Sequence, residues 1–264
     1  MAGFLDRYQA GEHEDVWAEL VALNGQVRRE PFRNDAVAVA AETMRRARHN
    51  VEAIIVVLDE MGYQFLASRT AEYFPPSNIN PFTKEPMPGP RELIRKAMIF
   101  DPPDPDAADK ILEWERLAGA IPLSIRGWYE VVGEVNLTGS HPRWALLYLD
   151  PLVMPSLDSL LRYHRATASR LRRKTVPRGQ AFLSLPDYVM KDGLSGAQYW
   201  IDLPNAGADA PLEGWSELTT DSEKTYFVAY LRLSFRFGGF PGFAHRASLR
   251  KRDRARLTRD LFPL

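Results

Sequence analysis

The sequence predicts an α+β protein, in which a helical first part precedes a region that mixes helices with short strands. Residues 13–61 show only the three- and four-residue spacing of apolar side chains that is typical of helices. Short apolar or alternating runs typical of strands are concentrated after residue 140. This distribution favours an α+β fold over a doubly wound parallel sheet. The 264 residues, of which 45% are hydrophobic, are enough for one large buried core.

The first segment, residues 1–67, is expected to contain an antiparallel helical hairpin over residues 13–61. The first helix of the hairpin has apolar residues at Val16, Leu20, Leu23 and Val27. Asn34 is the expected N-cap of the second helix. The apolar positions of this second helix alternate in steps of three and four: Val37, Ala40, Met44, Ala47, Val51, Ile54, Leu58 and Met61. Such a pattern predicts two helices packed lengthwise, and Gly62 stands where a left-handed residue ends a helix.

A short strand is expected at Tyr63–Leu66, followed by a proline-rich connecting region over residues 68–105. Six prolines fall between residues 68 and 90, and they predict a long loop. Ordered loops of this length are uncommon unless they have a function. Pro90 is expected to open a short helix that ends near Ile99. A second proline-rich turn, Asp101–Asp106, then leads into the next helix.

The remaining segment, residues 106–264, is expected to form the mixed core and to pack with the hairpin as one unit. We expect helices over residues 106–117, after Pro122, after Ser156, over residues 225–237 and over residues 247–260. We expect strands at residues 145–149, 180–185 and 199–203. The glycines Gly238 and Gly239 follow a helix, so they predict a left-handed exit from that helix and not a phosphate-binding loop.

Composition limits the function classes. Lys plus Arg and Asp plus Glu are equal at 34 each, so no net field favours nucleic acid or an anionic membrane. The absence of cysteine excludes disulfides, thiolate metal sites and a cysteine nucleophile. The first residues lack the basic and apolar segments of a signal peptide, and no apolar run reaches the ~20 residues of a membrane span. A cytoplasmic protein is therefore expected.

Residues with catalytic or metal-binding chemistry form no known motif. No two of the five histidines lie three to five residues apart, and His164 falls within an apolar stripe, as a core histidine would. Asp101, Asp104, Asp106 and Asp109 are close enough for a hard cation, but aspartates in a proline-braced turn also cap helices. We expect no metal, no cofactor and no catalytic residue, which favours a protein that is not an enzyme.

Two resemblances follow from longer segments. Ala120–Gly133, with a proline before an aromatic helix that ends at glycine, resembles the SUKH superfamily, which joins a yeast cell-wall assembly regulator to bacterial immunity proteins. Asp187–Lys191, Ala208–Leu212 and Gly238–Gly242 resemble a group of bacterial proteins without an established activity, marked by the sequence GGFPG. The SUKH resemblance implies a mixed sheet with flanking helices, aromatic side chains facing the sheet, and protein binding, including binding of toxins.

The sequence leaves three functions open. The first is a non-catalytic module that binds another protein, for example a toxin, and an acidic partner surface would meet the basic helix after Ser156. Its expected partner-binding residues are Trp128, Tyr129, Trp144, Arg165, Arg172, Arg173, Tyr188 and Trp200. The second is a small-ligand protein or enzyme with a pocket for an anion at Asp187, Lys191, Arg232 and Arg236. The alternative for Arg232 and Arg236 is that they belong to an internal ion-pair network and bind no ligand. Nucleic-acid binding through basic helices is the third.

Overall fold

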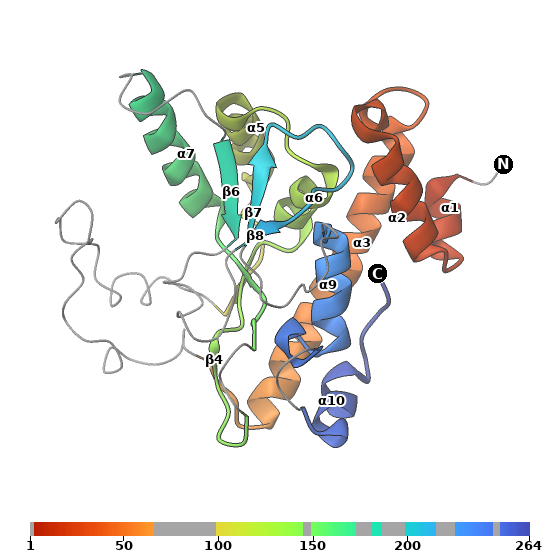
Figure 1. Ribbon diagram of the computed structural model, residues 1–264, viewed down its shortest axis with the longest axis vertical. Helices are drawn as coiled ribbons and strands as arrows, with labels where there is room; N and C mark the ends of the chain where they lie inside the picture. Colours follow the sequence, from red (N-terminus) through yellow and green to blue (C-terminus); the bar gives the residue numbers. More distant parts are fainter. Residues whose placement is uncertain are drawn as a thin grey trace.

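The computed structural model describes residues 3–65, 99–144, 149–172, 181–185, 199–214, 225–244 and 249–264 (Figure 1). Its helices are α1 (Phe4–Gln9), α2 (His13–Ala22), η1 (Asn24–Arg28), α3 (Arg33–Glu60), α5 (Ala107–Ala118), α6 (Leu123–Val131), α7 (Leu157–Arg172), α9 (Phe227–Arg236), η3 (Pro241–Ala244) and α10 (Lys251–Thr258). Its strands are β1 (Gln64–Phe65), β2 (Phe100–Asp101), β3 (Glu134–Asn136), β4 (Gly139–Ser140), β5 (Val153–Met154), β6 (Ala181–Leu185), β7 (Tyr199–Leu203) and β8 (Glu213–Gly214). Helices with small antiparallel sheets confirm the α+β class.

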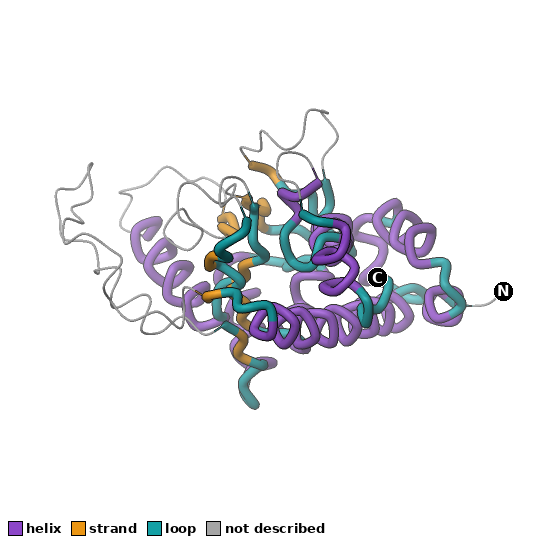
Figure 2. The backbone as a smooth tube through the Cα atoms, turned by 90° about the horizontal axis from the view of Figure 1, so that it is seen from below, coloured by secondary structure: helices purple, strands orange, loops and turns teal. Residues whose placement is uncertain are grey.

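Helix α3 is the longest element, and it runs through the molecule as a spine (Figure 2). Its 28 residues span about 42 Å, whereas the 10 residues of α2 span about 15 Å. Helix α2 reaches α3 where the Trp17 indole donates to the Thr43 hydroxyl at 3.0 Å. Helix α6 and the segment after α10 pack against other parts of α3. The predicted lengthwise hairpin is therefore wrong, because α2 is too short to cover the apolar side of α3.

The ends of α3 test two predictions. Gly62 has a φ of +76° and its N–H donates to the carbonyl of Asp59, so the predicted left-handed helix end is confirmed. Asn34, in contrast, lies inside the helix, which begins at Arg33 with Phe32 at the N-cap. The prediction of Asn34 as the cap is wrong, and its amide donates to the Glu30 carboxylate at 3.4 Å.

The described strands form three separate antiparallel sheets, ordered β1-β4, β2-β3-β5 and β6-β7-β8. The single mixed sheet implied by the SUKH resemblance is therefore not found among the described residues. Strand β7 has the predicted bounds, and Tyr199, Ile201 and Leu203 all point to a buried face. Residues 145–148 lie outside the described part of the chain, and Leu149 belongs to no strand. The loop predicted over residues 68–90 and the helix from Pro90 also lie outside it.

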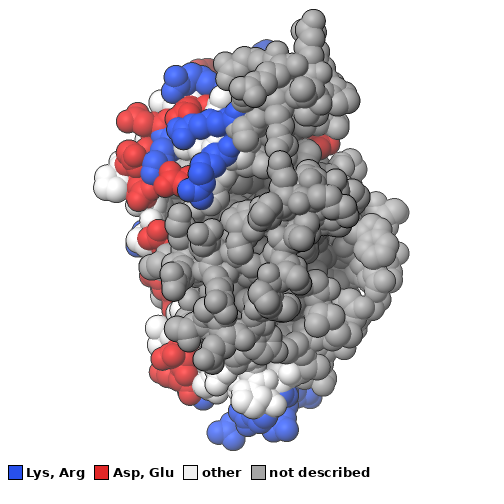
Figure 3. Space-filling model, turned by 90° about the vertical axis from the view of Figure 1, so that its left-hand side faces the viewer, with Lys and Arg blue, Asp and Glu red and all other residues white. Residues whose placement is uncertain are grey.

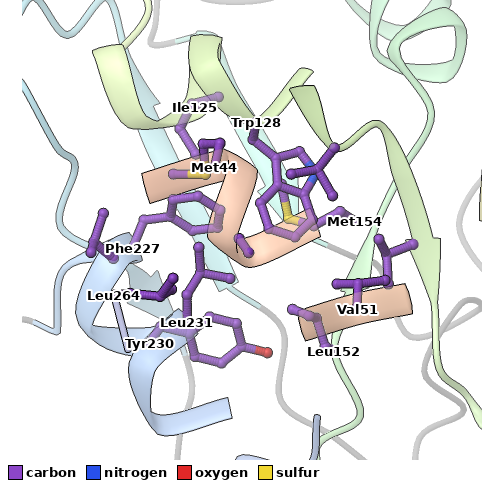
Figure 4. Close-up of a cluster of buried hydrophobic side chains, with 14 of the residues drawn as sticks. Met44, Val51, Ile125, Trp128, Leu152, Met154, Phe227, Tyr230, Leu231 and Leu264 are labelled. Atoms are coloured by element: carbon purple, nitrogen blue, oxygen red, sulfur yellow. The ribbon is translucent and has the colours of Figure 1, made fainter. Parts of the chain in front are cut away.

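One cluster of buried apolar side chains joins the N-terminal helices to the later elements (Figure 4). Met44 of α3 faces Gly127 of α6, where an added Cβ would lie 3.3 Å from the Met44 side chain. Asp209 links the start of α6 to the start of α9, because its carboxylate accepts from the Ser124 hydroxyl at 2.6 Å and from the Val228 N–H at 3.0 Å. No helix in the described ranges has both the length and the apolar character required to cross a membrane.

Candidate functional site

The aromatic residues predicted to bind a partner are buried. Trp128 is 0%, Tyr129 1% and Trp144 8% exposed, so their prediction as an interface is wrong. Trp128 donates to the Gly133 carbonyl at 2.7 Å, and its ring packs edge-on against Phe227 of α9. The Trp144 ring packs on Tyr63, His141, Phe240 and Phe243, so these aromatic side chains belong to the core. Tyr188 and the side chain of Trp200 lie outside the described residues.

Of the two arginines of the basic helix α7 whose side chains the structure describes, Arg162 donates only to the Ser159 hydroxyl, at 2.9 Å, and Arg165 is paired. Arg165 forms a two-pronged pair with Glu113 of α5, at 2.6 and 2.7 Å, although it is half exposed. Figure 3 shows basic and acidic side chains intermingled on the described part of this face. The Arg172 side chain and Arg173 lie outside the described residues. An acidic partner would therefore compete with Glu113, which weakens the case for this helix as the interface.

The second basic helix, α10, is similarly engaged. The Arg254 guanidinium lies 4.3 Å from the centre of the Phe237 ring. Arg256 pairs with Glu60 at 2.8 Å, across the junction with α3. Because these arginines bind other parts of the same chain, α10 offers less free charge than the sequence indicates.

A groove at the end of the chain includes two of the predicted ligand-binding residues. It has a volume of about 320 Å³ and is formed by the start of α2, one face of α9, the end of α10 and the segment that follows. We call it the C-terminal groove; its lining residues are Glu14, Arg232, Phe235, Arg236, Thr258, Leu261, Phe262, Pro263 and Leu264. Arg232 and Arg236 reach it together because residues four apart lie on one face of a helix. Their prediction as neighbours on a ligand-binding wall is consistent with this geometry.

Helix α3 holds the far wall of the C-terminal groove in place. The Asn50 side chain, 0% exposed, donates to the Phe262 carbonyl at 2.9 Å and accepts from the Phe262 N–H at 2.7 Å. The His49 ring stacks on the Phe262 ring with centroids 4.3 Å apart. One amide therefore satisfies both backbone groups of Phe262, and the residue is still 51% exposed.

The two arginines of the C-terminal groove differ in their surroundings. Arg232 donates to the backbone carbonyls of Leu264 and His13, at 2.7 and 2.8 Å, and burial lowers its pKa. Glu14, which lies on the rim, acts against this shift. Arg236 is exposed and has no ion pair within the described ranges. Arg232 therefore holds the end of the chain and the start of α2 against α9, and Arg236 is a cation available to a ligand.

The alternative expectation for Arg232 and Arg236 was an internal ion-pair network, with Asp187, Asp202 and Asp209 as the candidate carboxylates. Asp209 binds Ser124 and the first turn of α9, although its charge also acts on Arg232. The expected internal ion-pair network is replaced by bonds from Arg232 to backbone carbonyls. Asp187 and Lys191 lie outside the described residues. Neither Glu14 nor Phe262 was predicted as a site residue, and no pattern in the sequence marks Glu14. The one signal for Phe262 is the apolar run that follows the basic stretch before residue 260.

The histidine and aspartate predictions have mixed outcomes. His164 is 2% exposed, as a core residue should be, but its Nε2 has no hydrogen-bond partner among the described residues. Asp106 occupies the N-cap position of α5 but its side chain makes no capping hydrogen bond, and both Asp104 and Asp106 bind Lys110. No cluster of three metal-binding side chains exists in the described ranges. Lys110 therefore lies between carboxylates of the aspartate-rich turn and of α7.

Comparisons with known proteins identify no relative: no protein-family model, curated protein or solved structure matches the chain. The SUKH resemblance and the resemblance to the GGFPG group therefore stay predictions. The assignment of function depends on the geometry of the C-terminal groove.

Proposed function

We propose that the protein binds another protein, and that it does so through the C-terminal groove. The observation that carries this proposal is that exposed Phe262 and Arg236, which has no ion pair among the described residues, line the wall of one groove. Aromatic and arginine side chains contribute most to the free energy of protein association. This pair favours a partner segment that has one large apolar side chain and one carboxylate.

The shape of the groove favours a segment of a protein over a small molecule. Small-molecule sites enclose most of their ligand, and their volumes begin near ~300 Å³. The C-terminal groove has about 320 Å³ and its aromatic ring is half exposed. A peptide segment would cover Phe262 and leave its own backbone in solvent. A small organic anion is the alternative ligand, and Arg236 would be its principal contact.

A random peptide library displayed on phage tests this proposal against the immobilised protein. We expect the enriched peptides to share a carboxylate and an aromatic or large aliphatic residue. Arg236→Glu is expected to weaken their binding at least about tenfold, since it replaces a charge-assisted hydrogen bond by repulsion. Phe262→Ala removes the apolar contact but keeps the backbone bonds to Asn50, so it should mainly raise the dissociation rate.

Arg116→Glu is the matched control. Arg116 is exposed on α5, has no ion pair within the described ranges, and donates to the Leu112 carbonyl of its own helix, away from the groove. The same charge reversal there should leave peptide binding unchanged. Enrichment of no peptide family, or equal loss in the Arg116 and Arg236 variants, would exclude the groove as a protein-binding site. The SUKH resemblance adds toxins as a partner class, and a toxin would have to bind in the same Arg236-dependent way.

A further inference from the structure

One wall of the C-terminal groove is held against the rest of the molecule by two arginines. This wall is formed by residues 261–264, which we call the C-terminal segment. Arg46 of α3 donates from Nη1 to the Pro263 carbonyl at 3.2 Å. Arg232 of α9 donates to the Leu264 carbonyl at 2.7 Å. The position of the C-terminal segment therefore depends on what surrounds these two guanidinium groups.

His13, the first residue of α2, contacts both arginines. Its Nε2 lies 2.7 Å from Nη1 of Arg46, the same nitrogen that donates to Pro263. Its backbone carbonyl accepts from Arg232 at 2.8 Å. A guanidinium group has N–H donors and no acceptor, so Nε2 of His13 accepts the bond and carries no proton. The imidazole is therefore neutral in this arrangement.

The groups packed against the His13 ring disfavour a positive charge on it. The Tyr8 ring of α1 packs edge-on against the imidazole, with centroids 4.6 Å apart. Burial, followed by the charges of Arg46 of α3 and Arg232 of α9, lowers the pKa of His13 below its ordinary value of 6.5. All three causes act in the same direction.

The carboxylates near His13 do not offset the two arginine charges. Glu42 of α3 accepts from the Arg46 Nε at 3.0 Å, and Glu12, just before α2, accepts from Arg7 at 2.8 Å. Glu14 and Asp15 follow His13 in the first turn of α2. No ion pair joins any of these carboxylates to the His13 ring within the described ranges.

Protonation of His13 brings two cations into contact. The Arg46 guanidinium has little freedom to move away, because Glu42 binds it and its carbon lies 5.1 Å from the centre of the Tyr8 ring. The His13 ring is therefore displaced, and the backbone carbonyl that accepts from Arg232 belongs to the same residue. Both arginines that hold the C-terminal segment lose a neighbour that positions them.

We propose that protonation of His13 releases the C-terminal segment and thereby removes one wall of the C-terminal groove. Acidification then weakens the binding of a partner that needs Phe262 in its place. This effect on a partner rests on the proposed function of the groove, whereas the release of the segment does not.

The direction of the pH dependence follows from the form of His13 that Arg46 binds. Because the held segment lowers the pKa of His13, the held state is fully favoured above about pH 6.5 and loses stability as the pH falls below that value. With an ordinary pKa in the released state, a change from pH 7.5 to pH 5.5 raises the released population by up to about tenfold. We expect an increase of at least about threefold.

Amide hydrogen exchange of the whole chain, followed by mass spectrometry at pH 5.5 and pH 7.5, measures the release. The Phe262 N–H donates to the Asn50 side chain at 2.7 Å, so this amide is protected while the segment is held. After correction for the intrinsic pH dependence of exchange, the fragment covering residues 259–264 should exchange about threefold to tenfold faster at pH 5.5. A fragment from α5 serves as the internal reference and should show no such change.

Two variants assign the effect to His13. His13→Gln supplies a neutral acceptor at every pH, so the C-terminal segment should stay protected and the pH dependence should disappear. His49→Gln is the matched control, because Nε2 of His49 lies 3.0 Å from the Asp260 carbonyl and donates to it whether or not the ring is charged. Whatever its effect on the basal exchange rate, the His49 variant should keep the pH dependence. If His13→Gln does not fold, an NMR titration of the unaltered chain replaces it, and the Phe262 amide should change along the titration curve of the His13 ring.

The outcomes separate this proposal from the proposed function. Exchange that does not depend on pH, or that keeps its pH dependence in His13→Gln, would overturn the release. Peptides selected on the groove should bind more weakly at pH 5.5 than at pH 7.5, by about the factor measured in exchange, and only while His13 is present. Affinity that ignores pH while exchange responds to it would overturn the control of the groove by His13. Failure to select any peptide would exclude the proposed function, and the exchange measurement would still decide the release.

Discussion

Replacement of Val51 by aspartate tests the role of α3 as the spine of the fold. Val51 is 0% exposed and lies beside Leu152 in the core (Figure 4). Loss of the buried valine removes about 1.5–3 kcal/mol of apolar burial. A carboxylate without a partner at this position adds about 3 kcal/mol or more. The expected loss of about 4 kcal/mol or more is a large part of the ~5–15 kcal/mol that stabilises a typical domain.

Val56→Asp on the same helix is the matched control. Val56 is 58% exposed, so the same substitution there changes helix propensity without burying a charge. We expect Val56→Asp to change the free energy of unfolding by less than about 1 kcal/mol. Urea unfolding followed by circular dichroism measures both variants, and Val51→Ala gives a milder change if Val51→Asp does not fold.

The pH dependence of the free energy of unfolding of Val51→Asp and Val56→Asp is a second readout. Burial would raise the pKa of an aspartate at position 51, so its neutral form would be favoured in the folded state. The difference in the free energy of unfolding between the two aspartate variants should therefore become smaller as the pH falls toward about 4. Equal stability of the two variants at neutral pH would refute the placement of Val51 in the core and the packing of α3 derived from it.

Two further predictions concern the exit from α9 and the buried carboxylate at its start. Gly238 and Gly11 both have positive φ, but only at Gly238 would an added Cβ meet another side chain, that of Leu257, at 2.6 Å. We therefore expect Gly238→Ala to lower the free energy of unfolding by about 3 kcal/mol or more and Gly11→Ala by about 1 kcal/mol, as measured by thermal unfolding. Burial raises the pKa of Asp209 from 3.8 to about 6, so the folded state binds this proton more tightly and the group's contribution to stability falls as the pH rises from about 4 to about 6. Asp209→Asn should remove that part of the pH slope in urea unfolding, while Ser124→Ala should keep it; an unchanged slope in the Asp209 variant would contradict the prediction.

Local signals in the sequence predicted local structure well. The α+β class, the bounds of β7 and the helix after Ser156 all follow from periodicity and capping residues within a few positions. Gly62 and Gly238 both have the positive φ expected from their places after helices. Each of these features depends on near neighbours in the chain, and a single sequence contains that information.

The choice of packing partner could not be predicted in the same way. An apolar stripe shows that a helix is buried on one side, but α3 uses that stripe mainly with α6 and not with the adjacent α2. A high density of aromatic residues is typical both of a binding surface and of a buried core, and Trp128 and Tyr129 lie in the core. Arg165 was expected to be free for a partner because its carboxylate partner, Glu113, lies 52 residues away in the sequence.

The C-terminal groove shows why its residues were only partly predictable. The spacing of Arg232 and Arg236 on one helix placed them together, and the sequence contains that spacing. Their different roles depend on backbone carbonyls: Arg232 is fixed by the carbonyls of His13 and Leu264, which no side-chain pattern reveals. Arg236 has no such acceptor in the described part of the chain, and the groove therefore presents one cation held for structure and one available for binding.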